Sequence, residues 1–149
     1  MTYLSEADFQ QIENTLAIQL PTHFKNFHLQ QQKLIKELKE LVNELDQSIS
    51  LATDVESILM INQFLEVPKT EGPFRYKFSI GQDGCGNFAL IDLKKADNTK
   101  VYYSDHDEYD FEEIFDPSIN DFKWDSFEGL SRGESIEEYV RGEIAWRKD

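Results

Sequence analysis

The sequence is poor in cysteine and in long apolar runs. Cys85 is its single cysteine, so no internal disulfide can form. The N-terminus lacks the basic start and apolar run of a secretory signal. No apolar stretch approaches the roughly 20 residues that a helix needs to cross a bilayer. These absences favour a cytoplasmic protein, and the 149 residues predict one domain, 1–149, with its own hydrophobic core.

Basic residues are also scarce relative to acidic ones. The chain has 15 Lys and Arg against 29 Asp and Glu, for a formal net charge of −14. Binding nucleic acid requires clustered bases, and an anionic membrane surface repels such a chain, so neither is an expected partner. A basic protein partner is permitted. The excess is concentrated in residues 105–149, which hold 15 acids and 5 bases.

Helical patterns fill the first part of the chain. Ser5 and Asp8 resemble a capping box that opens a helix from about Glu6 to Leu20, and Pro21 then breaks the chain. An apolar stripe predicts a second, long helix over 22–49. The stripe suits core packing better than a coiled-coil seam because Gln31 interrupts it, so we expect a monomer, with a homodimer through this helix left open. Thr53 is the expected cap of a third, short helix, and Asn62 begins the turn after it.

The apolar period changes to two at Phe74. Alternation predicts a half-buried strand over 74–80, and two further strands are expected over 88–93 and 100–103. Three successive strands without an intervening helix favour an antiparallel meander. Ser135 opens a last helix with Ile136, Tyr139 and Val140 inward. The predicted fold class is therefore α+β, an antiparallel meander sheet packed with N-terminal helices and a C-terminal helix.

The stretch SIGQDGCGNFALIDL, residues 79–93, contains Gly81, Gly84 and Gly86. A strand follows these glycines, not the helix that a dinucleotide fingerprint needs, and the spacing lacks the oxygen ligands of a calcium loop. We expect a hairpin turn in which all three glycines take positive φ angles. Cys85 has no local signature of a catalytic base, so a small residue in a tight loop is the preferred interpretation.

Asp105, His106 and Asp107 are the best candidates for a metal or acid–base site. A further converging ligand is not visible, and His23 and His28 are five residues apart, not the four of a zinc-binding helix. We favour a solvent-facing acidic cluster that stabilises charged His106, and we expect no metal, no cofactor and no catalytic residue. The aromatic residues Trp124 and Trp146 either anchor the C-terminal part or form a partner-binding patch.

Several segments together resemble the SUKH superfamily, which contains bacterial immunity proteins of polymorphic toxin systems and fungal regulators of cell-wall synthesis. Leu20-Pro21 followed by an aromatic-rich helix is similar to the family's N-terminal pattern. FSIGQDGCGNFALIDL resembles its central hairpin, with the motif positions Gly86, Asn87, Phe88, Leu90 and Asp92. VYYSDHDE, residues 101–108, resembles the strand and His-Asp that follow. The resemblance implies a SUKH-like fold and a non-enzymatic immunity protein that neutralises a cognate toxin domain.

The acidic run, residues 105–113, is the predicted partner-binding surface, because its charge would attract a basic, nuclease-type toxin. Alternatives remain at this point: a solvated face without a partner, an intracellular scaffold or regulatory module, and a metal-dependent hydrolase that uses Asp105, His106 and Asp107. The residues predicted to contact the toxin are Asp105, Asp107, Glu108, Tyr109, Asp110, Glu112 and Glu113.

Overall fold

Five helices and seven strands make up the part of the chain that the structure describes. This computed structural model describes residues 2–41, 50–71, 74–83, 86–104, 115–116, 118, 121–122 and 131–148. In chain order the elements are α1 (Glu6–Leu16), α2 (Thr22–Gln30), α3 (Gln32–Leu41), β1 (Ser50–Leu51), α4 (Val55–Phe64), β2 (Lys77–Gln82), β3 (Phe88–Asp92), β4 (Val101–Ser104), β5 (Phe115–Asp116), β6 (Asp121–Phe122), β7 (Ser131–Gly133) and α6 (Ile136–Lys148).

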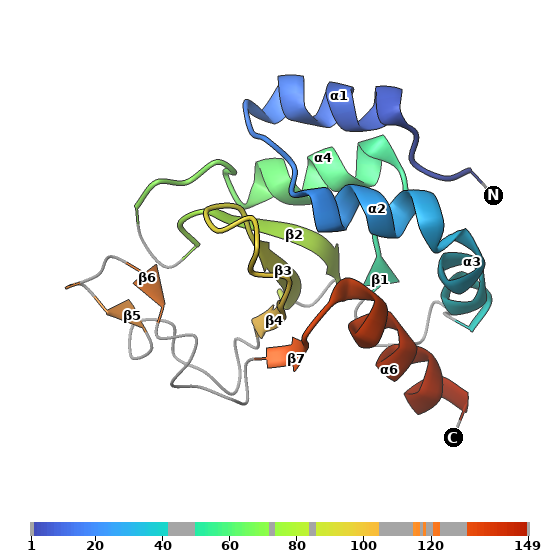
Figure 1. Ribbon diagram of the computed structural model, residues 1–149. Helices are drawn as coiled ribbons and strands as arrows, with labels where there is room; N and C mark the ends of the chain where they lie inside the picture. Colours follow the sequence, from blue (N-terminus) through green and yellow to red (C-terminus); the bar gives the residue numbers. More distant parts are fainter. Residues whose placement is uncertain are drawn as a thin grey trace.

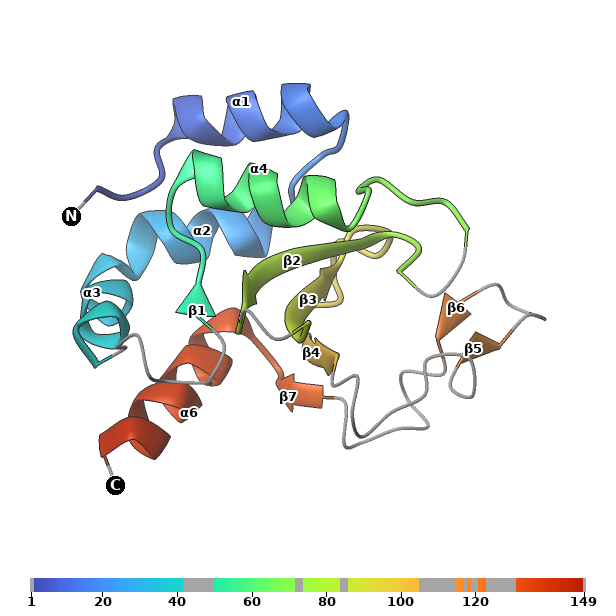
Figure 2. The same cartoon turned by 180° about the vertical axis from the view of Figure 1, so that it is seen from behind.

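Helices cover an antiparallel sheet whose strand order is β1-β2-β3-β4-β7. Helix α4 packs against β2, and α1 packs on α4 (Figure 1). Helices α3 and α6 pack together near the two chain ends, whereas the separate β5–β6 pair lies at the opposite end of the molecule (Figure 2). The predicted α+β class is confirmed.

The predicted meander forms the centre of the sheet. Strand β2 pairs antiparallel with β3, and β3 pairs antiparallel with β4. Strands β1 and β7, which extend the meander on either side, are not among the strands predicted from the sequence. These edge strands have only two and three residues, too few for alternation to be visible in the sequence.

Helix α1 begins at the predicted capping box and ends earlier than predicted. The backbone N–H of Ser5 donates to Asp8 Oδ2 at 2.8 Å, and that of Asp8 donates to Ser5 Oγ at 3.3 Å. The helix ends at Leu16, not Leu20, because Ala17 adopts a left-handed conformation with φ 55°. Glu13 then accepts the Leu20 N–H at 2.9 Å, so its side chain holds the chain in a turn.

The predicted long helix is two helices. Pro21 lies at the predicted break, and α2 begins at Thr22 as expected. Gln31, with φ −113° and ψ 38°, separates α2 from α3, which contradicts the continuous helix over 22–49. After the bend, Phe24 of α2 packs on Phe78 of the sheet, while α3 packs on α6, which α2 also contacts. The apolar stripe of α3 is thereby buried in the core of its own chain. Residues 42–49 lie outside the described part.

Side-chain caps begin the other two helices. Asp54, one residue after the expected Thr53, caps α4 by accepting the N–H of Ser57 at 2.7 Å. Helix α4 continues through Asn62, where a turn was predicted, and ends at Phe64. Ser135 caps α6 as predicted, accepting the N–H of Glu138 at 3.1 Å. The residues predicted to point inward from α6, Ile136, Tyr139 and Val140, are buried.

Strand β2 is buried on both faces, not half-buried as predicted, and it begins at Lys77. Residues 74–76 form a turn instead. Lys77 and Ser79, expected to face water, are 1% and 0% exposed. Their polar groups are hydrogen-bonded within the protein: Lys77 Nζ donates to the Arg75 carbonyl at 3.3 Å, and Ser79 Oγ donates to that of Gly81 at 2.8 Å. Alternation cannot distinguish polar residues buried in this way from polar residues in water.

The side chain of Asn62 joins α4 to β2. Its amide nitrogen donates to the Ser79 carbonyl at 3.0 Å and to the Ile58 carbonyl at 2.9 Å. Its amide oxygen accepts the Ser79 N–H at 2.8 Å. Asn62 is fully buried and thus supplies β2 with the two hydrogen bonds that a neighbouring strand would otherwise make.

His28 lies in an aromatic cluster in the core. Its ring centroid is 4.6 Å from that of Phe24, 5.4 Å from that of Phe27 and 6.5 Å from that of Phe9. Burial lowers the pKa of His28 to about 4, because the charged form would lose its hydration. The folded protein therefore holds His28 in its neutral form at pH 7.

We expect Asn62→Leu to lower the free energy of unfolding by about 3 kcal/mol, because it leaves the buried N–H and carbonyl of Ser79 without partners. Gln63→Leu, at the exposed neighbouring position, is the control and should change stability by less than about 0.5 kcal/mol. Urea unfolding followed by circular dichroism measures both. Equal stability of the two variants would contradict the role assigned to Asn62.

Neutral His28 makes stability dependent on pH. Its pKa is lower in the folded state than the unfolded value of 6.5, so its contribution is complete above pH 6.5 and is lost as the pH falls toward 4. Between about pH 7 and pH 5 the wild type should lose about 2 kcal/mol more than His28→Gln, which does not titrate. Urea unfolding of both proteins at both pH values tests this difference, and parallel losses would argue against it.

Candidate functional site

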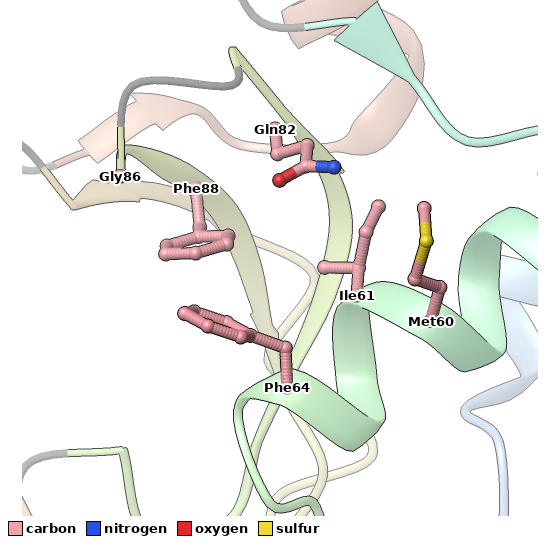
Figure 3. Close-up of a pocket in the computed structure, with 6 residues that line it drawn as sticks. All are labelled: Met60, Ile61, Phe64, Gln82, Gly86 and Phe88. Carbon is pink, nitrogen blue, oxygen red and sulfur yellow. The ribbon is translucent and has the colours of Figure 1, made fainter.

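An apolar groove lies between α4 and the tip of the β2–β3 hairpin (Figure 3). Its volume is about 290 Å³. Three residues of α4 and three of the hairpin segment line it: Met60, Ile61, Phe64, Gln82, Gly86 and Phe88. None of these six side chains ionises near neutral pH, so the described lining can bind apolar groups and supplies no general acid, base or nucleophile. Gly84 and Cys85, between Gln82 and Gly86, lie outside the described residues.

The groove has a buried floor and an exposed rim. Ile61 and Phe88 are 4% and 6% exposed, whereas Met60 and Phe64 are 59% and 75% exposed. The rings of Phe64 and Phe88 face each other with centroids 6.2 Å apart and planes inclined at 31° (Figure 3). Two large apolar side chains thus remain in water beside an apolar floor, which is typical of a contact surface.

The two rim residues of α4 share one helical face. Met60 and Phe64 are four residues apart, and Glu56 lies four residues before Met60. The opposite face carries Ile58 and Asn62, which are buried against the sheet. The position of Asn62 therefore determines that the face with Met60 points away from the core.

The hairpin beside the groove is closed by Asp83 and Asn87. Asp83 Oδ2 accepts the Asn87 side-chain amide at 2.8 Å, and its Oδ1 accepts the Asn87 backbone N–H at 3.2 Å. Gly86 has φ 93°, as predicted for the turn. Gly81 does not have a positive φ, because it lies within β2 next to an irregularity in the register with β3. Gly84 lies outside the described residues.

Asp92, the last motif position, stabilises the turn that follows β3. Its Oδ1 accepts the N–H groups of Lys94 and Lys95 at 2.7 and 3.3 Å. Its Oδ2 accepts the side-chain amide of Asn98 at 3.2 Å. Asp92 is 5% exposed, so its role is to hold the chain between β3 and β4 in place.

A second cavity, of about 250 Å³, lies between α2 and the start of α6. Its lining mixes polar and apolar residues, among them His23, Gln31, Thr99 and Ile136. Burial lowers the pKa of His23, which favours its neutral form. The mixed lining of this cavity favours neither polar nor apolar ligands, whereas the lining of the groove beside α4 favours apolar groups.

Sequence reasoning missed Met60 and Phe64. Phe64 fell in the turn expected after Asn62, and Met60 was not assigned to the inward stripe. One signal was available in the sequence: residues 60 and 64 repeat the helical spacing on the face opposite Ile58 and Asn62. Whether such a pair is covered depends on its neighbours in space, which the local pattern does not contain.

All the partner-binding residues predicted from the sequence lie outside the described part of the chain, as do His106, Cys85 and Trp124. Trp146 lies on α6 and is 63% exposed, so it does not anchor the core. Among the residues that the structure describes, no three His, Cys, Asp or Glu side chains are grouped to hold a metal ion. Within the same residues, no helix is long and apolar enough to span a membrane.

Comparison with protein families identifies the fold described above. The model of the SMI1 / KNR4 family (SUKH-1) matches residues 3–128. The chain belongs to this family. The resemblance inferred from Leu20-Pro21 and the central hairpin is thereby confirmed. A search of curated proteins gives no match.

The SUKH-1 match spans α1 to β6 and ends before β7 and α6, so it includes both sides of the apolar groove. The family is generally non-enzymatic, and membership indicates protein–protein interaction. The described lining residues of the groove include no ionisable group, which agrees with binding as its use.

We expect Phe64→Ser to lower the free energy of unfolding by less than about 1 kcal/mol, because most of its ring is in water. Phe88→Ala should cost about 3 to 5 kcal/mol, because it creates a cavity in the floor. Chemical unfolding of both variants provides the comparison. If Phe64→Ser cost as much as Phe88→Ala, Phe64 would belong to the core and not to an open rim.

Proposed function

We propose that this SUKH-1 chain is a non-enzymatic immunity protein that acts in the cytoplasm by binding and neutralising a cognate toxin domain with a basic, nuclease-type surface. The observation that carries the proposal is the groove beside α4, whose described lining is mostly apolar, has an exposed rim and contains no ionisable side chain. Membership of a family associated with protein–protein interaction supports it further.

Charge supports the choice of a basic partner. With a net charge of −14, the chain attracts basic proteins over several ångströms and repels acidic ones. Such attraction raises the association rate more than it raises the final affinity. An acidic protein can also cover the basic cleft in which a nuclease holds its own nucleic-acid substrate. One contact would then produce both binding and inhibition.

We assign the first encounter to the acidic run, defined as residues 105–113, where acids are densest in the sequence. Charged groups act at a range of about 8–10 Å at physiological ionic strength, before close contacts form. Tyr109 would add an aromatic contact once the surfaces meet. The acidic run thus accounts for speed, and apolar contacts account for the lifetime of the complex.

The direct test is to look for a toxin-like gene beside this one and to co-express the toxin domain that it encodes with this chain. Cells that produce the toxin should survive when this chain is present, and the purified proteins should form a complex in which toxin activity is lost. An absence of both rescue and complex would favour the alternative, a scaffold or regulatory module with other partners.

Reversing the charge of Asp107, Glu108 and Asp110 to Lys should slow association with that toxin about tenfold or more and reduce its salt dependence. The control reverses three exposed acids elsewhere, Glu71, Asp97 and Glu134, with the same change in net charge. Stopped-flow or surface-plasmon measurements at several salt concentrations give the rates. An equal effect of the two triple variants would assign the steering to net charge and not to the acidic run.

A further inference from the structure

The two chain segments that build the groove beside α4 contain acidic residues and no basic ones, although Lys39 of α3 lies close enough to Asp54 to interact with its charge. Residues 54–68 and 81–88, the two segments that build the groove, contain four acids and no Lys or Arg: Asp54, Glu56, Glu66 and Asp83. Glu56 is exposed one helical turn from Met60 on the same face of α4. An apolar group that enters the groove therefore meets negative charge at its edge.

The size of the groove limits what can occupy it. At about 290 Å³ it falls at or below the lower end of the roughly 300–1,000 Å³ typical of small-molecule sites. Among the described residues that line it, Gln82 alone has a polar side chain, which is too little to orient a polar ligand. One large apolar side chain of another protein suits both the volume and the lining.

Charge decides among possible protein partners. A second copy of this chain would bring another net charge of −14 to the same surface, so self-association through the groove is electrostatically opposed. A basic surface is attracted, and its Lys or Arg can lie opposite Glu56 while its apolar residue fills the groove. Burial of the exposed parts of Met60 and Phe64 would then stabilise the complex.

We infer that the groove formed by α4 and the β2–β3 hairpin is the docking site for a protruding apolar side chain flanked by Lys or Arg on a basic protein. This inference rests on the proposed function in taking that protein to be the toxin. The acidic run is assigned the first encounter with the toxin, whereas the groove is assigned the lasting contact. That contact is made by Met60, Phe64 and Phe88, on elements that the structure describes.

Binding to the toxin domain identified by the co-expression test examines the inference with matched variants. Phe64→Ser and Met60→Ser should each raise the Kd by about tenfold or more. Trp146→Ser removes a similarly exposed aromatic residue from α6, and it should change the Kd less than about twofold. Glu56→Gln should weaken binding more at about 50 mM salt than at about 300 mM salt.

The outcomes separate the two proposals. If the wild type does not bind the toxin, the proposed function fails. If the wild type binds but Phe64→Ser and Met60→Ser bind equally well, the groove is not the docking site and the proposed function stands. If the wild type is a dimer that Phe64→Ser converts to a monomer, a second copy occupies the groove and the inference is overturned.

Synthetic peptides test the groove without the toxin. One peptide places Phe between two Lys-Arg pairs, a second has Ser in place of Phe, and a third has Glu in place of each Lys and Arg. The first should shift the NMR signals of residues 60, 64 and 88, and Phe64→Ser should abolish these shifts. Equal shifts with the Ser peptide, or no shift at these residues with any peptide, would overturn the inference.

Discussion

The amide of Asn62 holds α4 against the open side of β2, and the arrangement of the molecule around it depends on this contact. Strand β1 pairs with β2 at Gly81 and Gln82 and does not extend to Ser79, and Asn62 satisfies the buried N–H and carbonyl of Ser79 instead. Leaving this buried N–H and carbonyl without hydrogen bonds would destabilise the fold. Helix α4 therefore has one favourable position along β2. Every other residue of α4 is oriented by that position.

The groove is a consequence of the same contact. With Asn62 turned toward β2, Met60 and Phe64 lie on the outer face of α4, while Ile61 stays near the sheet. Phe88 is the first residue of β3 and directly follows the turn that Asp83 and Asn87 close. This position brings the ring of Phe88 opposite that of Phe64. The apolar surface is thus formed by a helix and a hairpin that are each fixed independently by buried or partly buried hydrogen bonds.

Local signals were sufficient where a short stretch of chain decides its own conformation. The capping box of α1, the start of α2 after Pro21 and the Ser135 cap of α6 were predicted because each depends on residues within one turn. Local signals were insufficient at Gln31, where the chain bends between α2 and α3 although the apolar stripe continues. Local signals also gave a wrong exposure for Lys77 and Ser79, because the burial of these side chains depends on elements distant in sequence.

By itself, the sequence determined the α+β class, the central meander, the family and the acidic charge that favours a basic partner. Each of these follows from composition or from residues close together in the chain. Only the tertiary structure decided that Met60 and Phe64 are open to water beside Phe88. Exposure is set by what other elements leave uncovered, because the same apolar spacing serves equally for a core and for a binding surface.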